Sequence, residues 1–167
     1  MRLLKVTQMI KILEQYHQLA ECILLEINWT HYGTTAELAF NYVWTDEGKI
    51  RSHLEQEERL VLKFKWVQEF HIKNALNNAM LAQPERINWG LNEIAFVKIE
   101  ENEAFLKNYR FLSIPFHHAA ILWEDERRID IVFGDLEVES QASLTPYLWG
   151  RHSHLPTFNS NQVKSGG

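Results

Sequence analysis

From residue 3 to residue 19 the apolar side chains recur every third or fourth position, a spacing that places them on one face of an α-helix. The residues that share this face are Leu3, Val6, Met9, Ile10, Leu13, Tyr16 and Leu19. Lys5, Lys11 and Glu14 occupy other positions of the helical projection. The pattern predicts one amphipathic helix over about residues 5–20.

After residue 21 the apolar period changes to two, which is typical of a β-strand with one buried face. The first two segments of this kind span residues 22–31 and 36–45. Their alternating apolar residues are Ile23, Leu25, Ile27 and Trp29 in the first segment and Ala36, Leu38, Phe40, Tyr42 and Trp44 in the second. Gly33 lies between them and can adopt the positive φ of a short turn. We therefore expect an antiparallel hairpin.

Further strands are predicted over residues 59–72, 86–100, 109–124 and 127–139. The apolar face of the first is interrupted at Gln68, where we expect a bend or a bulge. In the last, the apolar positions change from odd to even across Gly134 and Asp135, which predicts a kink there.

These elements predict an α+β fold, with the N-terminal helix packed on a mostly antiparallel, twisted sheet of about six to eight strands. A chain of 167 residues is of single-domain size. We assign this domain to residues 1–140. Residues 141–167 contain Pro146, Pro156 and many small polar residues, so we expect a tail that is partly docked or flexible.

Composition narrows the class of protein. A hydrophobic fraction of 46% indicates a chain that folds. The formal charge of −5, without a basic stripe, argues against nucleic-acid binding and is compatible with a basic protein partner.

Cys22 is the single cysteine, the N-terminus has no signal-like apolar stretch, and no apolar run approaches membrane-spanning length. We expect a cytoplasmic protein with no disulfide and no membrane contact.

The stretch "IPFHHAAILWED", residues 114–125, holds the most chemically suggestive side chains. In a strand, the adjacent His117 and His118 point to opposite faces, so they cannot both ligate one metal ion. We interpret them as one surface histidine and one that is partly buried. A second motif, "HSH" at residues 152–154, has no third ligand at a telling spacing. We therefore predict no metal, no cofactor and no catalytic residue.

The tryptophans divide into two groups. Trp29, Trp44 and Trp66 lie on the apolar sides of their strands, and we expect them in the core. Trp123 is followed directly by Glu124, Asp125 and Glu126, which form an acidic collar around an aromatic side chain. We take Trp123, Glu124, Asp125, Glu126, His117 and His118 as candidate binding residues. Trp89 and Trp149, near a turn and in the tail, are further interface candidates.

The segments "LVLKFKWVQEFHI", "WGLNEIAFVKIE" and "AAILWEDERRIDIVFGDLEVE" carry a resemblance. Their arrangement, over about residues 20–139, resembles small bacterial immunity proteins of polymorphic-toxin systems and related uncharacterised bacterial α+β proteins. The resemblance implies a non-enzymatic cytosolic protein that binds and neutralises a cognate toxin. The acidic clusters would then face a basic toxin.

Two other hypotheses stay open. The chain could be a small-ligand binder or an enzyme that uses His117 or His118 with Glu124 or Asp125 in a sheet-face pocket. It could also be a self-associating structural component, with an edge strand or the C-terminal tail forming a homodimer.

Overall fold

The computed structural model describes residues 3–51, 58–74, 78, 82, 93–124 and 126–142. Within them the α-helices are α1 (Val6–Gln15) and α3 (Glu103–Leu106), and short 3-10 helices span η1 (His17–Leu19) and η2 (His31–Gly33). The strands are β1 (Ile23–Thr30), β2 (Thr35–Tyr42), β3 (Glu58–Lys65), β4 (Glu69–Lys73), β5 (Phe96–Glu100), β6 (His117–Leu122), β7 (Arg128–Phe133) and β8 (Asp135–Ala142).

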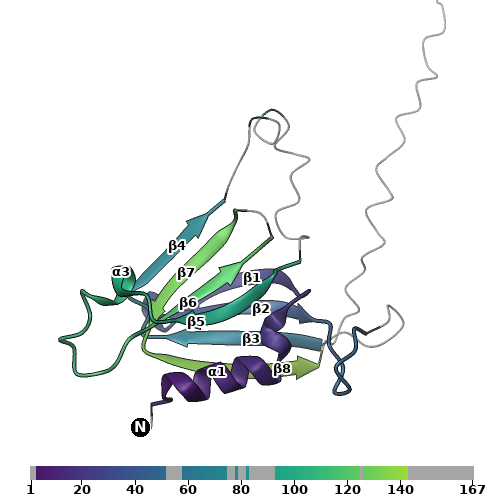
Figure 1. The fold of residues 1–167 in the computed structure, drawn as a ribbon, viewed down its shortest axis with the longest axis horizontal. Coiled ribbons are helices and arrows are strands. Elements are labelled where there is room, and N and C mark those ends of the chain that lie inside the picture. The colour runs from purple at the N-terminus through teal and green to yellow at the C-terminus, as the bar shows by residue number, and fades with distance from the viewer. Residues whose placement is uncertain are drawn as a thin grey trace, which may run out of the picture.

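These elements form an α+β fold whose paired strands are all antiparallel. The strands do not make the single sheet that we expected. They divide into two four-stranded sheets with the orders β1-β2-β3-β8 and β4-β7-β6-β5, which diverge from a shared corner (Figure 1). The expected tail falls outside the described residues from 143 onward, as do Asp125, Trp89, Trp149 and the "HSH" motif.

The chain crosses between the sheets twice, once from β3 to β4 and once from β7 to β8. The first crossing starts at Trp66, whose φ is +54°, and confirms the bend predicted near Gln68. The second is the kink predicted at Gly134. The Gly134 N–H donates to the Lys65 carbonyl at 2.9 Å, and a Cβ on Gly134 would lie 2.8 Å from the Trp66 ring. The two crossings therefore pack together so closely that only glycine fits.

The hairpin of β1 and β2 confirms the first prediction of sheet structure, and Gly33 has the expected positive φ of +82°. A bulge at Leu25 shifts the register, so that Leu24 instead of Leu25 packs against the core. The alternation of core-facing residues that we predicted for β1 is therefore wrong on the N-terminal side of the bulge. An extra residue reverses the faces of every position on one side of it.

The tryptophans are less buried than we predicted. Trp29 lies opposite the buried Ala36 but is 45% exposed, because it sits at the end of an edge strand, where its ring contacts Phe70 alone among aromatic rings of the described residues. Trp66 is half-buried at the corner. Trp44 is also half-buried and donates its indole N–H to the Ala20 carbonyl at 2.7 Å.

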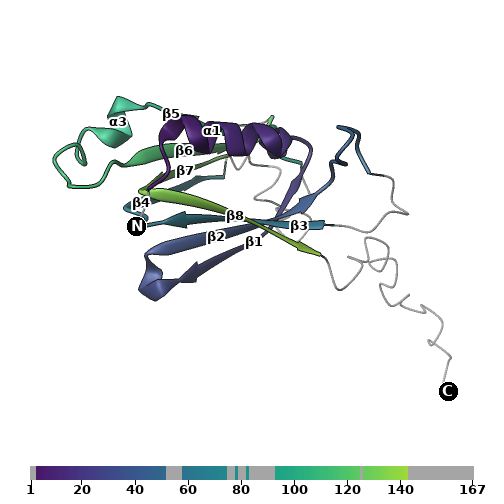
Figure 2. The same ribbon diagram turned by 90° about the horizontal axis from the view of Figure 1, so that it is seen from below.

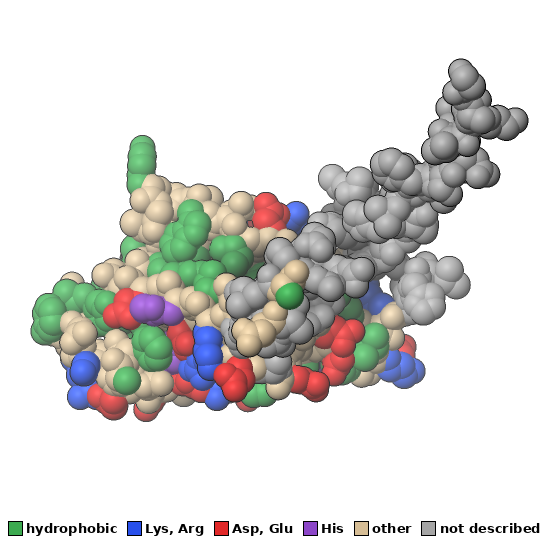
Figure 3. Space-filling model, turned by 90° about the horizontal axis from the view of Figure 1, so that it is seen from above, with side chains coloured by type: hydrophobic (Ala, Val, Ile, Leu, Met, Phe, Trp, Pro, Cys, Tyr) green, Lys and Arg blue, Asp and Glu red, His purple; other side chains and the backbone are tan. Residues whose placement is uncertain are grey.

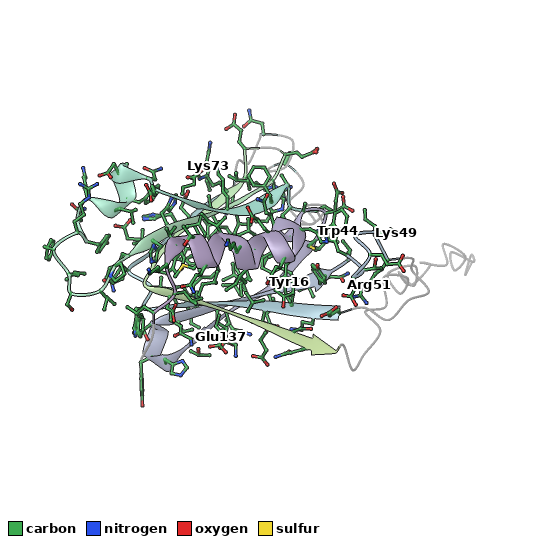
Figure 4. All side chains as sticks on the ribbon, turned by 60° about the horizontal axis from the view of Figure 1, so that its bottom comes forward. Tyr16, Trp44, Lys49, Arg51, Lys73 and Glu137 are labelled. Atoms are coloured by element: carbon green, nitrogen blue, oxygen red, sulfur yellow. The ribbon has the colours of Figure 1, made fainter. Side chains whose placement is uncertain are left out.

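The core lies between the two sheets and includes side chains of α1. Met9 and Leu13 of this helix are buried in the same cluster as Phe40, Phe64 and Phe133. Figure 2 shows α1 running along β5 and above β8. The helix ends at Gln15, earlier than predicted, because residues 17–19 turn back with positive φ. Figure 4 shows Trp44 near Tyr16, where the helix ends.

Candidate functional site

His118 is fully buried on the outer face of the second sheet and His117 is half-buried, so neither is the surface histidine that we predicted. The Nε2 of His118 lies 2.7 Å from Oδ1 of Asp130 on the neighbouring strand β7, and its Nδ1 lies 3.5 Å from Oε2 of Glu100 on β5. The ring of Phe105 from α3 stacks on the imidazole, with centroids 4.3 Å apart. His118 is thus held between two carboxylates and covered by an aromatic ring.

Arg128 completes this buried polar network. Its Nε donates to both oxygens of Asp130, at 2.7 and 2.8 Å, and its Nη2 lies 3.2 Å from Glu100. Burial alone would raise the pKa of Asp130, but the bonds from Arg128 and His118 hold it below its ordinary value. The pKa of Glu100 is likewise lowered, because Lys98 and Arg128 outweigh the burial of its carboxyl. Both acids are therefore anionic at neutral pH, whereas the buried Nδ1 of His118 has no hydrogen-bond partner in the described structure.

His117 points to the other side of the sheet, as the period of two requires. It lies opposite Phe133 in the register and its ring contacts that phenylalanine on the inner face. Its Nε2 is buried and has no hydrogen-bond partner in the described structure. Burial lowers the pKa of His117, although the charges of Asp135 and Glu101 oppose the shift. The two histidines therefore do not act together on one ligand.

The structure does not bring these histidines close to Glu124. His118 lies near the start of β6, and Glu124 follows the end of that strand. The four residue steps from His118 to Leu122 alone span about 13 Å of extended chain. The carboxylates that reach His118 are instead Asp130 and Glu100, which come from the neighbouring strands.

Around Trp123, by contrast, the structure gathers acidic residues from three distant segments. The two sheets meet here through a bridge between Ile23 and Glu93, in which the Glu21 N–H donates to the Ile94 carbonyl at 3.1 Å. Next to it the Ala95 N–H donates to the Leu122 carbonyl at 2.7 Å, which fixes the end of β6. We call Glu21, Glu93 and Glu124 the acidic corner.

The carboxylates of the acidic corner are close enough to affect one another. Burial raises the pKa of Glu93 above its ordinary value, and a hydrogen bond with Glu21 and the charges of Glu21 and Glu124 raise it further. Among ion pairs between described residues, none involves these three acids. Glu126, the other member of the predicted collar that is described, pairs with Lys73 at 3.0 Å. The corner thus brings three carboxylates together without an ion pair to any of them from another described residue.

Trp123 connects the acidic corner to an apolar groove. The groove has a volume of about 300 Å³ and opens between the edge strands β1 and β4. Its hydrophobic lining consists of Leu24, Ile27, Ile72, Trp123 and Ile129, and the charged residues that line it are Lys73, Arg127 and Arg128. Ile72 is 54% exposed, and Figure 3 shows hydrophobic side chains gathered on this side of the molecule. The half-buried indole of Trp123 also has the Arg127 guanidinium 5.5 Å from its centroid.

Sequence reasoning found Trp123 and Glu124 but missed Glu21 and Glu93. The acidic run 124–126 was visible in the sequence, whereas Glu21 precedes a strand and Glu93 interrupts an apolar one. No local spacing relates these positions. Only the bridge between residues 23 and 93 brings them together.

Comparison with known proteins adds little to this geometry. No protein-family model matches the chain, and no curated protein matches it. Among solved structures, an uncharacterized protein from Neisseria gonorrhoeae is similar at 19% sequence identity, with a TM-score of 0.45. The similarity covers 72% of this chain and 91% of that one.

Two further properties bear on the site. Within the described residues, no three His, Cys, Asp or Glu side chains are grouped so as to hold a metal ion. Across the same residues, every helix is too short or too polar to cross a membrane.

Proposed function

We propose that this chain is a non-enzymatic cytoplasmic binding protein of the immunity-protein kind, which holds a basic protein partner at the acidic corner and the adjoining Trp123. The observation that carries the proposal is the convergence of Glu21, Glu93 and Glu124 with no ion-pairing cation among the described residues. Like charges held together are unfavourable in the isolated protein. A partner's Lys or Arg side chains would relieve that repulsion on binding.

The aromatic and apolar surroundings support a protein partner over a simple ion. Most of the binding energy of a protein interface comes from a few residues from which water is excluded, and Trp is enriched among these residues. Trp123 and the hydrophobic residues of the groove supply that kind of surface. Because Lys73, Arg127 and Arg128 also line the groove, the partner's basic side chains would lie at the acidic corner and not in the groove. The net charge of −5 would also steer a basic partner toward the chain, with association about 10 to 1,000 times faster at low salt.

The buried histidine network gives less support to an enzyme. His118 is fully buried and bonded within the sheet, so a substrate would have to displace Phe105 to reach it. Glu100, Arg128 and Asp130 bond mainly to one another. Such a network fits a structural role in holding strands β5, β6 and β7 together.

The proposal is tested with the full chain as bait in a lysate of its native host, at about 0.05 M and about 0.5 M salt. The bait is compared with a Glu21→Gln, Glu93→Gln, Glu124→Gln triple variant. A matched control carries Glu37→Gln, Glu137→Gln and Glu139→Gln on the outer face of the first sheet. Each triple variant loses three negative charges, which changes the formal charge from −5 to −2.

We expect the parent and the control to retain a basic protein at low salt, and the acidic-corner variant to release it. The captured protein is then expressed alone and together with the chain. Growth arrest that the parent relieves and the acidic-corner variant does not would support the immunity class. Equal loss of capture in both triple variants would show that net charge alone acts, and would refute the assignment to this corner.

A further inference from the structure

A second hollow lies at the opposite end of β6 from the acidic corner. It has a volume of about 350 Å³, which falls within the size range of small-ligand pockets. We call it the α3 cavity, because it lies between α3, the loop of residues 107–116 and the first turn of α1. Val6 lines it from α1, and His117 lines it from β6.

The charged lining of the α3 cavity is mainly acidic. It comprises Glu100, Glu101 and Glu103 against the single guanidinium of Arg110. Arg110 pairs with Glu103, and Glu100 is already bonded to the buried network. Among described residues, Glu101 has no ion-pair partner. The imidazole of His117 adds no positive charge at neutral pH, because burial lowers its pKa. The cavity therefore favours a cationic group beside Glu101.

Apart from Tyr109, whose hydroxyl donates to Glu69, the rest of the lining is a hydrophobic wall. Leu106, Leu112, Ile114, Pro115 and Phe116 form this wall, and the neighbouring Phe111 is 81% exposed. A bare inorganic cation would leave such a wall in contact with water, whereas a ligand with a hydrocarbon body would cover it. Acidic and apolar walls in one hollow together select an amphipathic cation.

We propose that the α3 cavity binds a small aliphatic primary amine, with its ammonium group at Glu101 and its hydrocarbon chain along the wall of residues 112–116. This site is separate from the acidic corner and goes beyond the proposed partner binding. The same chemistry could come from a free amine or from a lysine side chain of a polypeptide. The test therefore includes a probe for each source.

The experiment titrates the full, isotopically labelled chain with hexylamine, 1-hexanol and hexanoate, and follows amide NMR shifts. We expect hexylamine to shift the signals of residues around the cavity, and 1-hexanol to bind about tenfold more weakly, because it lacks a charge-assisted hydrogen bond. Hexanoate should leave these signals unchanged. Nα-acetyl-lysine amide is titrated in parallel. Binding of hexylamine alone assigns the site to a free amine, and binding of acetyl-lysine amide assigns it to a lysine side chain.

A Glu101→Gln variant should weaken amine binding about fivefold, in the range of a partly exposed ion pair. Glu14→Gln, which removes one charge from the exposed side of α1, is the matched control and should change binding less than about twofold. Equal binding of 1-hexanol and hexylamine would overturn the proposal, as would amine titrations that leave the cavity signals in place. Neither result depends on the acidic corner, so partner binding is judged separately.

Discussion

Replacement of Asp130 by Asn should destabilise the fold strongly. The substitution keeps the shape of the side chain but removes the charge that holds both His118 and Arg128. His118 is fully buried, so its imidazole would be left without access to water, whereas the side chain of Arg128 is 30% exposed and keeps Glu100 as a partner. Removing one partner of a buried ion pair lowers the free energy of unfolding by about 3–5 kcal/mol. In a chain of this size that corresponds to a fall in Tm of about 6–20 °C.

The assay is chemical unfolding in urea, followed by tryptophan fluorescence and circular dichroism, together with a thermal melt. Glu137→Gln serves as the control, because it removes an ion pair with Lys65 in which the carboxylate side chain is 49% exposed. That exposed pair should contribute less than about 1 kcal/mol. If the two variants lose the same stability, the reasoning about burial is refuted.

The effect should also depend on pH. The folded-state pKa of Asp130 lies below its ordinary value of 3.8, so its contribution is complete above that value and is lost as the pH falls through the folded pKa. The difference between the parent and the Asp130→Asn variant should therefore be present at about pH 5 and shrink below about pH 4. A difference that persists unchanged at pH 2 would show that packing, and not charge, is lost.

Three further predictions concern the core and the corner between the sheets. Gly134→Val should lower the free energy of unfolding by about 1–3 kcal/mol through overpacking against Trp66, measured by urea unfolding; an unchanged midpoint would contradict the close approach. Leu13→Ala should cost about 2–5 kcal/mol in the same assay if α1 is part of the core, and a loss below about 0.5 kcal/mol would show that it is not. The Cys22 thiol, whose pKa burial raises to about 12, should react with a thiol reagent at pH 8 only after unfolding; rapid labelling of the native chain would refute its burial.

Predictions from the sequence were most successful where neighbouring residues decide the structure. The alternation of apolar residues located the hairpin of β1 and β2, and the interruptions near Gln68 and Gly134 marked the places where the chain bends. The same period of two placed His117 and His118 on opposite faces. These features follow from backbone geometry over a few residues, because successive side chains of a strand point in opposite directions.

The division into two sheets and the partners at each site required the tertiary structure. No local pattern shows that the strand before Trp66 pairs with one sheet and the strand after it with another. Glu21 and Glu93 become neighbours through the bridge at Ile23, and Glu124 joins them through the hydrogen bond from Ala95 to Leu122. His118 reaches Asp130 through the register of β6 and β7. Side-chain period fixes which face a residue occupies, whereas strand pairing across the chain decides which charges share that face.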